Sequence, residues 1–179
     1  VHPGYGFLSE RPELAEACAD HGLTFVGPSA ETIRSGGDKV AARSLARAAG
    51  VPVAAGSDIV STVEEASTAA EQIGYPIVLK AAAGGGGRGM VQVDGPVDLR
   101  SRFAAASTEA ESAFGDGRLY LERFIERARH VEVQILADGF GTVVHLGDRD
   151  CSLQRRYQKV VEEAPAAAVP GELRQRLAD

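Results

Sequence analysis

The chain has 179 residues with 25 acidic and 19 basic side chains, and its formal net charge of -6 argues against a broad surface for nucleic acid or for an anionic membrane. The apolar share of 44% is enough for a packed core, and no apolar run reaches the roughly 18 residues that a membrane helix needs. The length of the chain predicts one domain or two small ones. Cys18 and Cys151 form no metal or redox motif, so we expect a reducing, cytoplasmic compartment.

The first fifty residues predict helices separated by one short strand. Pro12 lies near the start of an apolar-periodic segment and Gly22 lies just beyond its end, which is typical of a helix. Residues 23–27 follow as a short buried strand, so that helix and strand alternate. Two further short helices are predicted over residues 29–37 and 38–50.

The middle of the chain predicts a helix, two strands and a second helix. Thr62 and Glu65 have the spacing of a capping box at the start of a helix that Gly74 ends. Strands are predicted over residues 75–82 and 88–93, on the two sides of a glycine-rich segment. A long helix follows, because apolar side chains recur at helical spacing before Gly115: Leu99, Phe103, Ala106, Ala110 and Phe114.

The last third of the chain predicts a strand and then a β-hairpin. Residues 118–125 have the composition of a strand, and residues 130–136 alternate between apolar and polar side chains. The Asp138-Gly139 turn joins this alternating strand to residues 141–148 as its antiparallel partner. Residues 171–179 have the pattern of a helix that is still running at the last residue, from which we expect the chain to be a fragment of a longer protein.

Five glycines stand within six positions of the segment KAAAGGGGRGM, residues 80–90, and such a cluster indicates positive φ angles or a very close approach of another group to the backbone. Gly84, Gly86 and Gly89 match G-x-G-x-x-G, but the dinucleotide fingerprint requires a helix directly afterwards, where a strand is predicted here. A P-loop is excluded because Met and Val follow Gly89 in place of Lys and Ser or Thr. The remaining arrangement of strand, glycine loop and strand is typical of a flap over nucleotide phosphates, with a plain flexible hairpin as the alternative.

The charges around the glycines favour the phosphate interpretation. No acidic residue stands between Glu71 and Asp94, while Lys80 and Arg88 bracket the glycines. A local cationic region of this kind suits an anionic ligand even though the chain as a whole is acidic.

A second polar segment, DRDCSLQRRYQKVVEEAP at residues 148–165, mixes both signs of charge with Gln and Tyr side chains. It directly follows the predicted hairpin strands. A solvated charged face is one interpretation, and a polar site for an anion is the other. The spacing of the residues alone does not separate the two.

Five segments resemble, in this order along the chain, the biotin carboxylase family of ATP-grasp enzymes: HPGYGFLSE, GDKVAARSLARAAGVPV, GYPIVLKAAAGGGGRGM, RHVEVQIL and RDCSLQRRYQKVVEEAP. The resemblance covers essentially the whole chain and is nearest to the biotin carboxylase components of acetyl-CoA or propionyl-CoA carboxylases. It implies an α/β fold class with an α+β lid, that is, an ATP-grasp fold fragment with the end of a Rossmann-like N-terminal domain. The implied divisions are this N-terminal domain over 1–27, a helical linker over 28–51, the lid over 52–124 and the start of the C-terminal subdomain over 125–179.

The resemblance implies an ATP-dependent ligase that carboxylates biotin on a carrier protein. ATP would phosphorylate bicarbonate to carboxyphosphate, and biotin would take the CO2 that carboxyphosphate releases. The implied cofactors are ATP, Mg2+ or Mn2+ and carrier-bound biotin, and the implied partners are a biotin carboxyl carrier, a carboxyltransferase and further copies of the chain. The alternatives are the biotin carboxylase domain of a pyruvate carboxylase, an ATP-grasp ligase with another acceptor, and a nucleotide-binding module without chemistry.

The resemblance also implies a role for individual side chains. Lys159 would be catalytic, holding bicarbonate and the developing carboxyphosphate in a dry site. Tyr5 and Phe7 would lie toward the biotin pocket. The implied nucleotide-binding residues are phosphate-binding Lys39, Lys80, Gly86 and Gly87, the adenine-binding strand of Glu122, Arg123, Phe124 and Ile125, and the ribose-side residues His130, Gln154 and Tyr157.

Two positions depart from the family pattern. Tyr157 stands where well-known bacterial members carry His, which puts its nucleotide contact in doubt, and Asp148 replaces a more usual Glu. The resemblance assigns no metal ligand within the chain, because the corresponding glutamates fall after residue 179. We therefore expect the chain by itself to be inactive.

Overall fold

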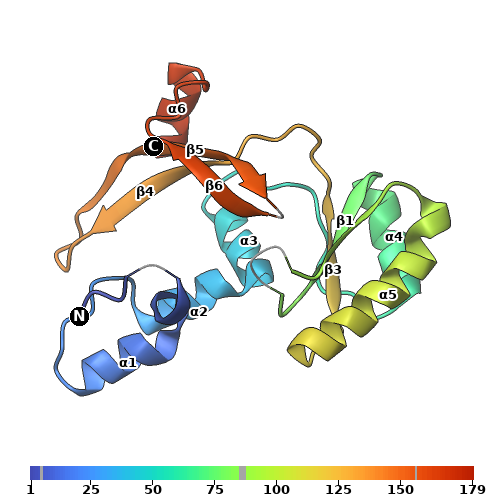
Figure 1. Cartoon of the computed structure of the whole chain (residues 1–179), viewed down its shortest axis with the longest axis horizontal. Coiled ribbons are helices and arrows are strands. Elements are labelled where there is room, and N and C mark those ends of the chain that lie inside the picture. Colours follow the sequence, from blue (N-terminus) through green and yellow to red (C-terminus); the bar gives the residue numbers. More distant parts are fainter. Residues whose placement is uncertain (5, 85–87, 156) are drawn as a thin grey trace. The chain divides into compact units, whose positions relative to one another are not determined.

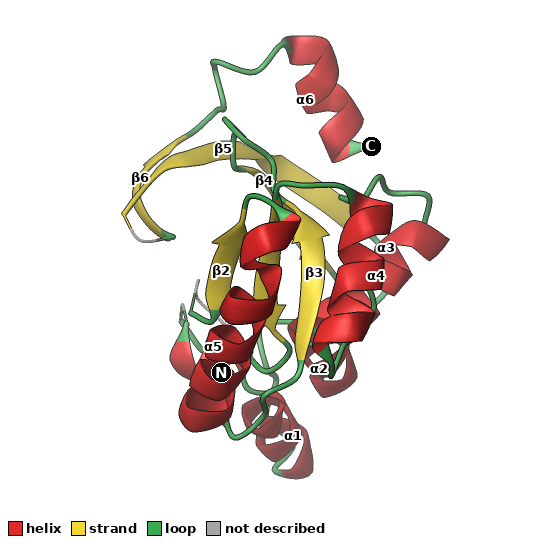
Figure 2. Ribbon diagram, turned by 90° about the vertical axis from the view of Figure 1, so that its right-hand side faces the viewer, coloured by secondary structure: helices red, strands yellow, loops and turns green. Residues whose placement is uncertain are grey.

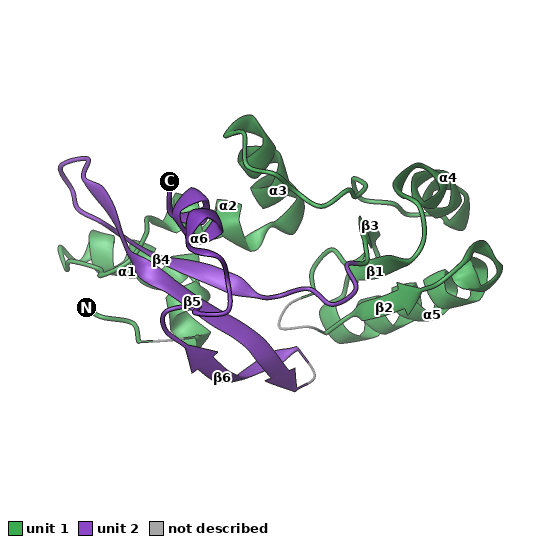
Figure 3. Cartoon of the chain, turned by 90° about the horizontal axis from the view of Figure 1, so that it is seen from above, with its two compact units in different colours: residues 1–84, 88–124 green, residues 85–87, 125–179 purple. Residues whose placement is uncertain are grey.

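The computed structural model describes residues 1–4, 6–84, 88–155 and 157–179. The chain divides into two compact units, coloured separately in Figure 3. The first unit contains Val1–Gly84 and Arg88–Phe124, and the second contains Ile125–Asp179. The boundary between the units after Phe124 lies where the lid is predicted to end. The described residues of the three parts predicted before it, 1–27, 28–51 and 52–124, all fall within the first unit, so the division among them stays a prediction.

Four short helices open the first unit (Figure 1): η1 Phe7–Glu10, α1 Pro12–Asp20, α2 Ala30–Gly37 and α3 Lys39–Ala48. The three α-helices confirm the predicted segments. Pro12 stands at the first helical position of α1, where a missing N–H costs nothing. The Asp38 carboxylate accepts hydrogen bonds from the amides of Val40 and Ala41, so it caps α3.

The strand predicted over residues 23–27 is wrong, because these residues form an irregular segment. Val26 donates its amide to the carbonyl of Val1, and the amino group of Val1 donates to the Thr24 carbonyl. Leu23 and Val26 are about half exposed, so the apolar run is not buried as expected.

The remainder of the first unit is a three-stranded antiparallel sheet with two helices. The strands β1 Ile77–Ala81, β2 Met90–Val93 and β3 Leu119–Arg123 have the order β2-β1-β3. The helices are α4 Val63–Ile73, which begins at the predicted capping box of Thr62 and Glu65, and α5 Pro96–Phe114. Figure 2 shows both helices on the same side of the sheet. A strand follows the glycines, as predicted, and not a helix.

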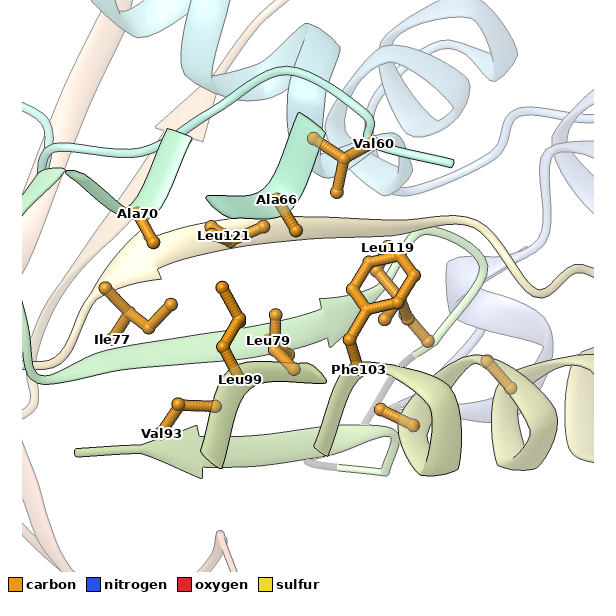
Figure 4. Packing of buried hydrophobic residues seen from close by; sticks show 13 residues of the cluster. Val60, Ala66, Ala70, Ile77, Leu79, Val93, Leu99, Phe103, Leu119 and Leu121 are labelled. Atoms are coloured by element: carbon orange, nitrogen blue, oxygen red, sulfur yellow. The ribbon is translucent and has the colours of Figure 1, made fainter. Parts of the chain in front are cut away.

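The core of the first unit lies between the sheet and the two helices. Leu79, Leu119 and Leu121 are fully buried beneath Leu99 and Phe103 of α5 (Figure 4). Because side chains alternate along a strand, the intervening residues of β1 and β3 face the other side of the sheet. The packing of the core therefore determines which side chains of β1 and β3 face the side of the sheet where a polar site can form.

The second unit is a three-stranded antiparallel sheet followed by one helix. Its strands are β4 Val131–Ala137, β5 Val143–Arg155 and β6 Gln158–Glu163, in the order β4-β5-β6, and its helix is α6 Gly171–Ala178. The predicted hairpin at Asp138 is confirmed, since Ala137 pairs with Val143. The charged segment does not follow the strands as expected but forms most of β5 and β6. Within the part of the chain that the structure describes, no helix is long and apolar enough to cross a membrane.

Candidate functional site

The polar face of the first sheet carries a group of three charged side chains. Lys80 pairs across the ladder with Tyr120, so Glu122 is its diagonal neighbour on the same face. Lys80 Nζ donates a hydrogen bond to Glu122 Oε2, and Arg43 Nε of α3 lies 3.6 Å from Glu122 Oε1. The exposed fractions of the three side chains are 23%, 17% and 13%, so they form a shielded ion-pair network.

Lys39 reaches the start of the glycine-rich segment. It is the first residue of α3, and its Nζ donates a hydrogen bond to the carbonyl of Gly84. The two lysines that are predicted to bind phosphate, Lys39 and Lys80, thus both belong to the first unit. Gly86 and Gly87, for which the same role is predicted, lie outside the described residues.

The predicted adenine-binding strand comprises the end of β3 and the junction to the second unit. The amide of Arg123 donates to the Ala55 carbonyl at 2.8 Å, and the amide of Phe124 donates to the Pro76 carbonyl at 3.0 Å. Both N–H groups are therefore already paired. Ile125 is more than half exposed. The Glu122 carboxylate, expected near the adenine amino group, is held by Lys80 and Arg43.

A hollow of about 620 Å³ in the second unit brings together four predicted residues. Gln154 Nε2 lies 2.9 Å from His130 Nδ1, as expected for two side chains at one ligand. Small-molecule sites of this size are usually lined mostly by apolar side chains with a few placed polar groups, so the lining of this hollow is more polar than usual. The lining residues are Ile125, Arg127, Ala128, Arg129, His130, Val131, Ser152, Gln154 and Tyr157.

Two lining residues of this hollow have a left-handed backbone. Arg127 has φ 52° and Tyr157 has φ 63°. Such conformations cost roughly 1–3 kcal/mol each for non-glycine residues, and they occur most often at ligand sites. Tyr157 stands in the short connection between β5 and β6, where a tight hairpin turn requires a positive φ, so its role at a nucleotide stays a prediction; its side chain is 59% exposed.

Lys159 is held by a carboxylate that the sequence analysis did not assign to a site. Lys159 Nζ and Arg149 both donate hydrogen bonds to Glu132, one to each carboxylate oxygen. The hydrogen bond from Lys159 is the main cause that lowers the pKa of Glu132 to about 2, and the same bond raises the pKa of Lys159. Lys159 is therefore kept charged and fixed in position.

This network predicts a specific loss of stability in acid. The folded-state pKa of Glu132 lies below its ordinary value of 4.5, so its contribution is present above about pH 5 and is lost as the pH falls toward about 2. At pH 7 we expect Glu132→Gln to lower the free energy of unfolding by about 1–3 kcal/mol. Urea unfolding across this pH range should show the difference between the two proteins shrinking in acid. A difference that is constant with pH would contradict the assignment.

The two aspartates of the charged segment have structural partners. Asp148 accepts hydrogen bonds from the Ala166 amide at 2.8 Å and from Arg174 of α6 at 2.6 Å, and Arg174 is the main cause that lowers its pKa. Asp150 accepts from Ser152 and Arg129. Both aspartates are buried, so a merely solvated charged face is excluded for this part of the segment. Asp148, shorter than the Glu usual in the family pattern, is long enough to tie α6 to β5.

One group among the described residues has the spacing of metal ligands: Glu132, Cys151 and Glu162 each offer an atom within 4.8 Å of the others. Mg2+ prefers an octahedral set of oxygen ligands, and a buried thiol does not suit it. Glu132 is in addition neutralised by two cations. This group does not fit the Mg2+ that the resemblance implies, and no chemical step is derived through it.

Sequence reasoning missed three members of these networks, Glu132, Arg149 and Arg43. An acidic side chain between Val131 and Val133 of an alternating strand must face away from the apolar side, which is a usable signal. Arg43 had no such signal, because its partner lies far away in the sequence. Tyr5 lies outside the described residues, and Phe7 is 93% exposed.

A glycine-rich connection between antiparallel strands in one unit, and a second antiparallel sheet with a fixed lysine and a polar hollow in the other, define the ATP-grasp class. The family model described as "Carbamoyl-phosphate synthase L chain, ATP binding domain" matches residues 38–179, and "Biotin carboxylase, N-terminal domain" matches residues 1–33. The chain belongs to the biotin carboxylase family.

Individual relatives agree with this assignment. The chain is 53% identical to biotin carboxylase from Nostoc sp. and 54% identical to human mitochondrial pyruvate carboxylase, over 99% of its length in both cases. It spans 40% of the first relative and 15% of the second. The biotin carboxylase domain of Hydrogenobacter thermophilus 2-oxoglutarate carboxylase, described as a dimer in complex with MgADP, ADP and bicarbonate, matches with a TM-score of 0.91 and 47% identity over 99% of this chain and 39% of that one.

Proposed function

We propose that the protein carboxylates carrier-bound biotin with bicarbonate and ATP, as the biotin carboxylase part of an acyl-CoA carboxylase. One observation carries the proposal: Gln154, which lines the hollow, pairs across the β-ladder with Lys159. A polar hollow and a fixed ammonium group thus adjoin in one sheet. This arrangement suits a nucleotide and an anionic second substrate, and the 2-oxoglutarate carboxylase domain described above was obtained with both kinds of ligand.

The chemistry requires two anions to approach each other. A bicarbonate oxygen attacks the γ-phosphorus of ATP, the bond to ADP breaks, and carboxyphosphate forms. Carboxyphosphate then releases phosphate and CO2, the released phosphate takes the proton from N1 of biotin, and N1 bonds to the CO2 carbon. Lys39 and Lys80 would offset the charge of the triphosphate, and Lys159 would hold bicarbonate. Fixed cations act strongly here because they need no reorganisation as charge develops.

The partners follow from the chemistry, since biotin must be presented and then discharged. We propose a biotin carboxyl carrier, a carboxyltransferase and self-association, in the cytoplasm. A pyruvate carboxylase is the second candidate, because the identity to the human enzyme, 54%, is nearly the same as that to biotin carboxylase from Nostoc, 53%. The acceptor of the carboxyl group separates the two.

The experiment is ATP hydrolysis by the complete protein with biotin present, with and without bicarbonate. We expect bicarbonate to stimulate phosphate release and biotin to become carboxylated. ATP turnover that ignores biotin would favour a ligase with another acceptor. ATP binding without any turnover would favour a nucleotide-binding module, and either result would overturn the proposal.

A further inference from the structure

We propose that Arg43 is a positioning residue for ATP binding: by holding Glu122, it sets the place of the Lys80 ammonium group. This inference rests on the proposed function. Arg43 lies within the segment GDKVAARSLARAAGVPV, but the resemblance assigns it no ligand-binding role. It follows from the contacts of α3 with the polar face of the first sheet.

Lys39 and Arg43 stand four residues apart on α3 and therefore on one face of that helix. Each has its own anchor, Lys39 on the Gly84 carbonyl and Arg43 on Glu122. Two like charges at this spacing destabilise an isolated helix. Separate anchors offset this cost, and they tie α3 both to the glycine-rich segment and to β3.

The path of the Arg43 side chain depends on a glycine. A Cβ atom added at Gly56 would lie 2.4 Å from both terminal nitrogens of the guanidinium group. Gly56 also forms an isolated bridge with Glu122, and Arg43 donates to the carbonyls of Ala54 at 3.0 Å and Ser57 at 3.4 Å. The guanidinium group thus fills a fitted slot between residues 54–57 and Glu122.

Arg43 determines how the Glu122 carboxylate binds Lys80. Arg43 lies at Oε1 and Lys80 binds Oε2, so the carboxylate is shared and cannot turn toward Lys80 with both oxygens. Without Arg43 the carboxylate could rotate and draw the ammonium group away from a phosphate. Such a displacement of the Lys80 ammonium group would reduce the affinity for ATP.

The test is made in the complete protein, with ATP as the probe. For Arg43→Ala we expect the KM and Kd for ATP to rise about tenfold, equivalent to about 1.4 kcal/mol, with kcat changed less than about twofold. Gly56→Ala displaces the guanidinium group without touching its charge and should act in the same direction. Arg43→Lys should recover part of the affinity. Arg47→Ala, which removes an exposed charge one turn further along α3, should bind ATP normally.

A double-mutant cycle separates positioning from a general effect of charge. Since Arg43 acts through Glu122, Arg43→Ala should weaken ATP binding by less than about twofold when Glu122 is already alanine. An equal effect in both backgrounds, or normal ATP binding by both Arg43→Ala and Gly56→Ala, would overturn the inference. If Arg43→Ala fails to fold, Gly56→Ala and Arg43→Lys decide the question. Failure of the unchanged protein to bind ATP would instead overturn the proposed function, and the inference with it.

Discussion

Replacing Lys159 with glutamine is expected to reduce bicarbonate-dependent ATP hydrolysis by about 100-fold or more while changing ATP affinity less than about threefold. The reason is that Lys159 is the cation proposed for bicarbonate and for the charge that develops during phosphoryl transfer. Glutamine keeps a donor for Glu132, so the network with Arg149 persists and the fold is retained. Steady-state phosphate release and equilibrium ATP binding measure the two effects separately.

A matched control exists in the same unit. Arg176→Gln removes one exposed charge from α6 and should leave hydrolysis unchanged. If Lys159→Gln kept full bicarbonate stimulation, the catalytic assignment would be wrong. If it lost ATP binding to the same extent as turnover, Lys159 would belong to the nucleotide site and not to the bicarbonate site.

The secondary structure was largely predictable because local signals and tertiary packing agree. Caps and apolar spacing define α1 to α5, and residue alternation defines β4. The segment over residues 23–27 failed because a strand needs a partner, and an apolar run carries no information about whether one is present. For the charged segment the sequence left a solvated face and a polar site as open alternatives, because its aspartates are buried by partners on α6 and before β4, which no local pattern could reveal.

The lysines of the candidate site could be predicted from the sequence. The ion pairs that hold these lysines were much harder to predict. The sequence contains only three lysines among 19 basic residues, at positions 39, 80 and 159, and all three are predicted site residues. The ion pairs of Lys80 and Lys159 were not foreseen: Glu122 was predicted to bind adenine and Glu132 was assigned no role, and both meet their lysines only through strand pairing. Long-range ion pairs leave no periodic trace in a sequence.

The same scarcity of lysine makes Lys80 the second sensitive position. At 16 positions this chain uses arginine for positive charge, so a lysine indicates a place where a compact ammonium group is needed and a planar guanidinium group does not fit. For Lys80→Gln we expect ATP to bind about 10- to 100-fold more weakly, because a charge-assisted contact to a phosphate is lost. Lys80→Arg should restore little of this affinity despite its full charge.

Thermal unfolding with and without ATP measures the effect of Lys80 independently of turnover. A ligand stabilises the folded state by RT ln(1 + [L]/Kd), so the ATP-dependent rise in Tm should largely vanish in Lys80→Gln. The Tm without ATP should change little, because Glu122 keeps Arg43 as its partner when Lys80 is replaced. Arg102→Gln, an exposed position on α5, provides the control for charge alone. A normal rise in Tm for Lys80→Gln, or full recovery in Lys80→Arg, would remove Lys80 from the phosphate site and would leave the lysine pattern as an accident of composition.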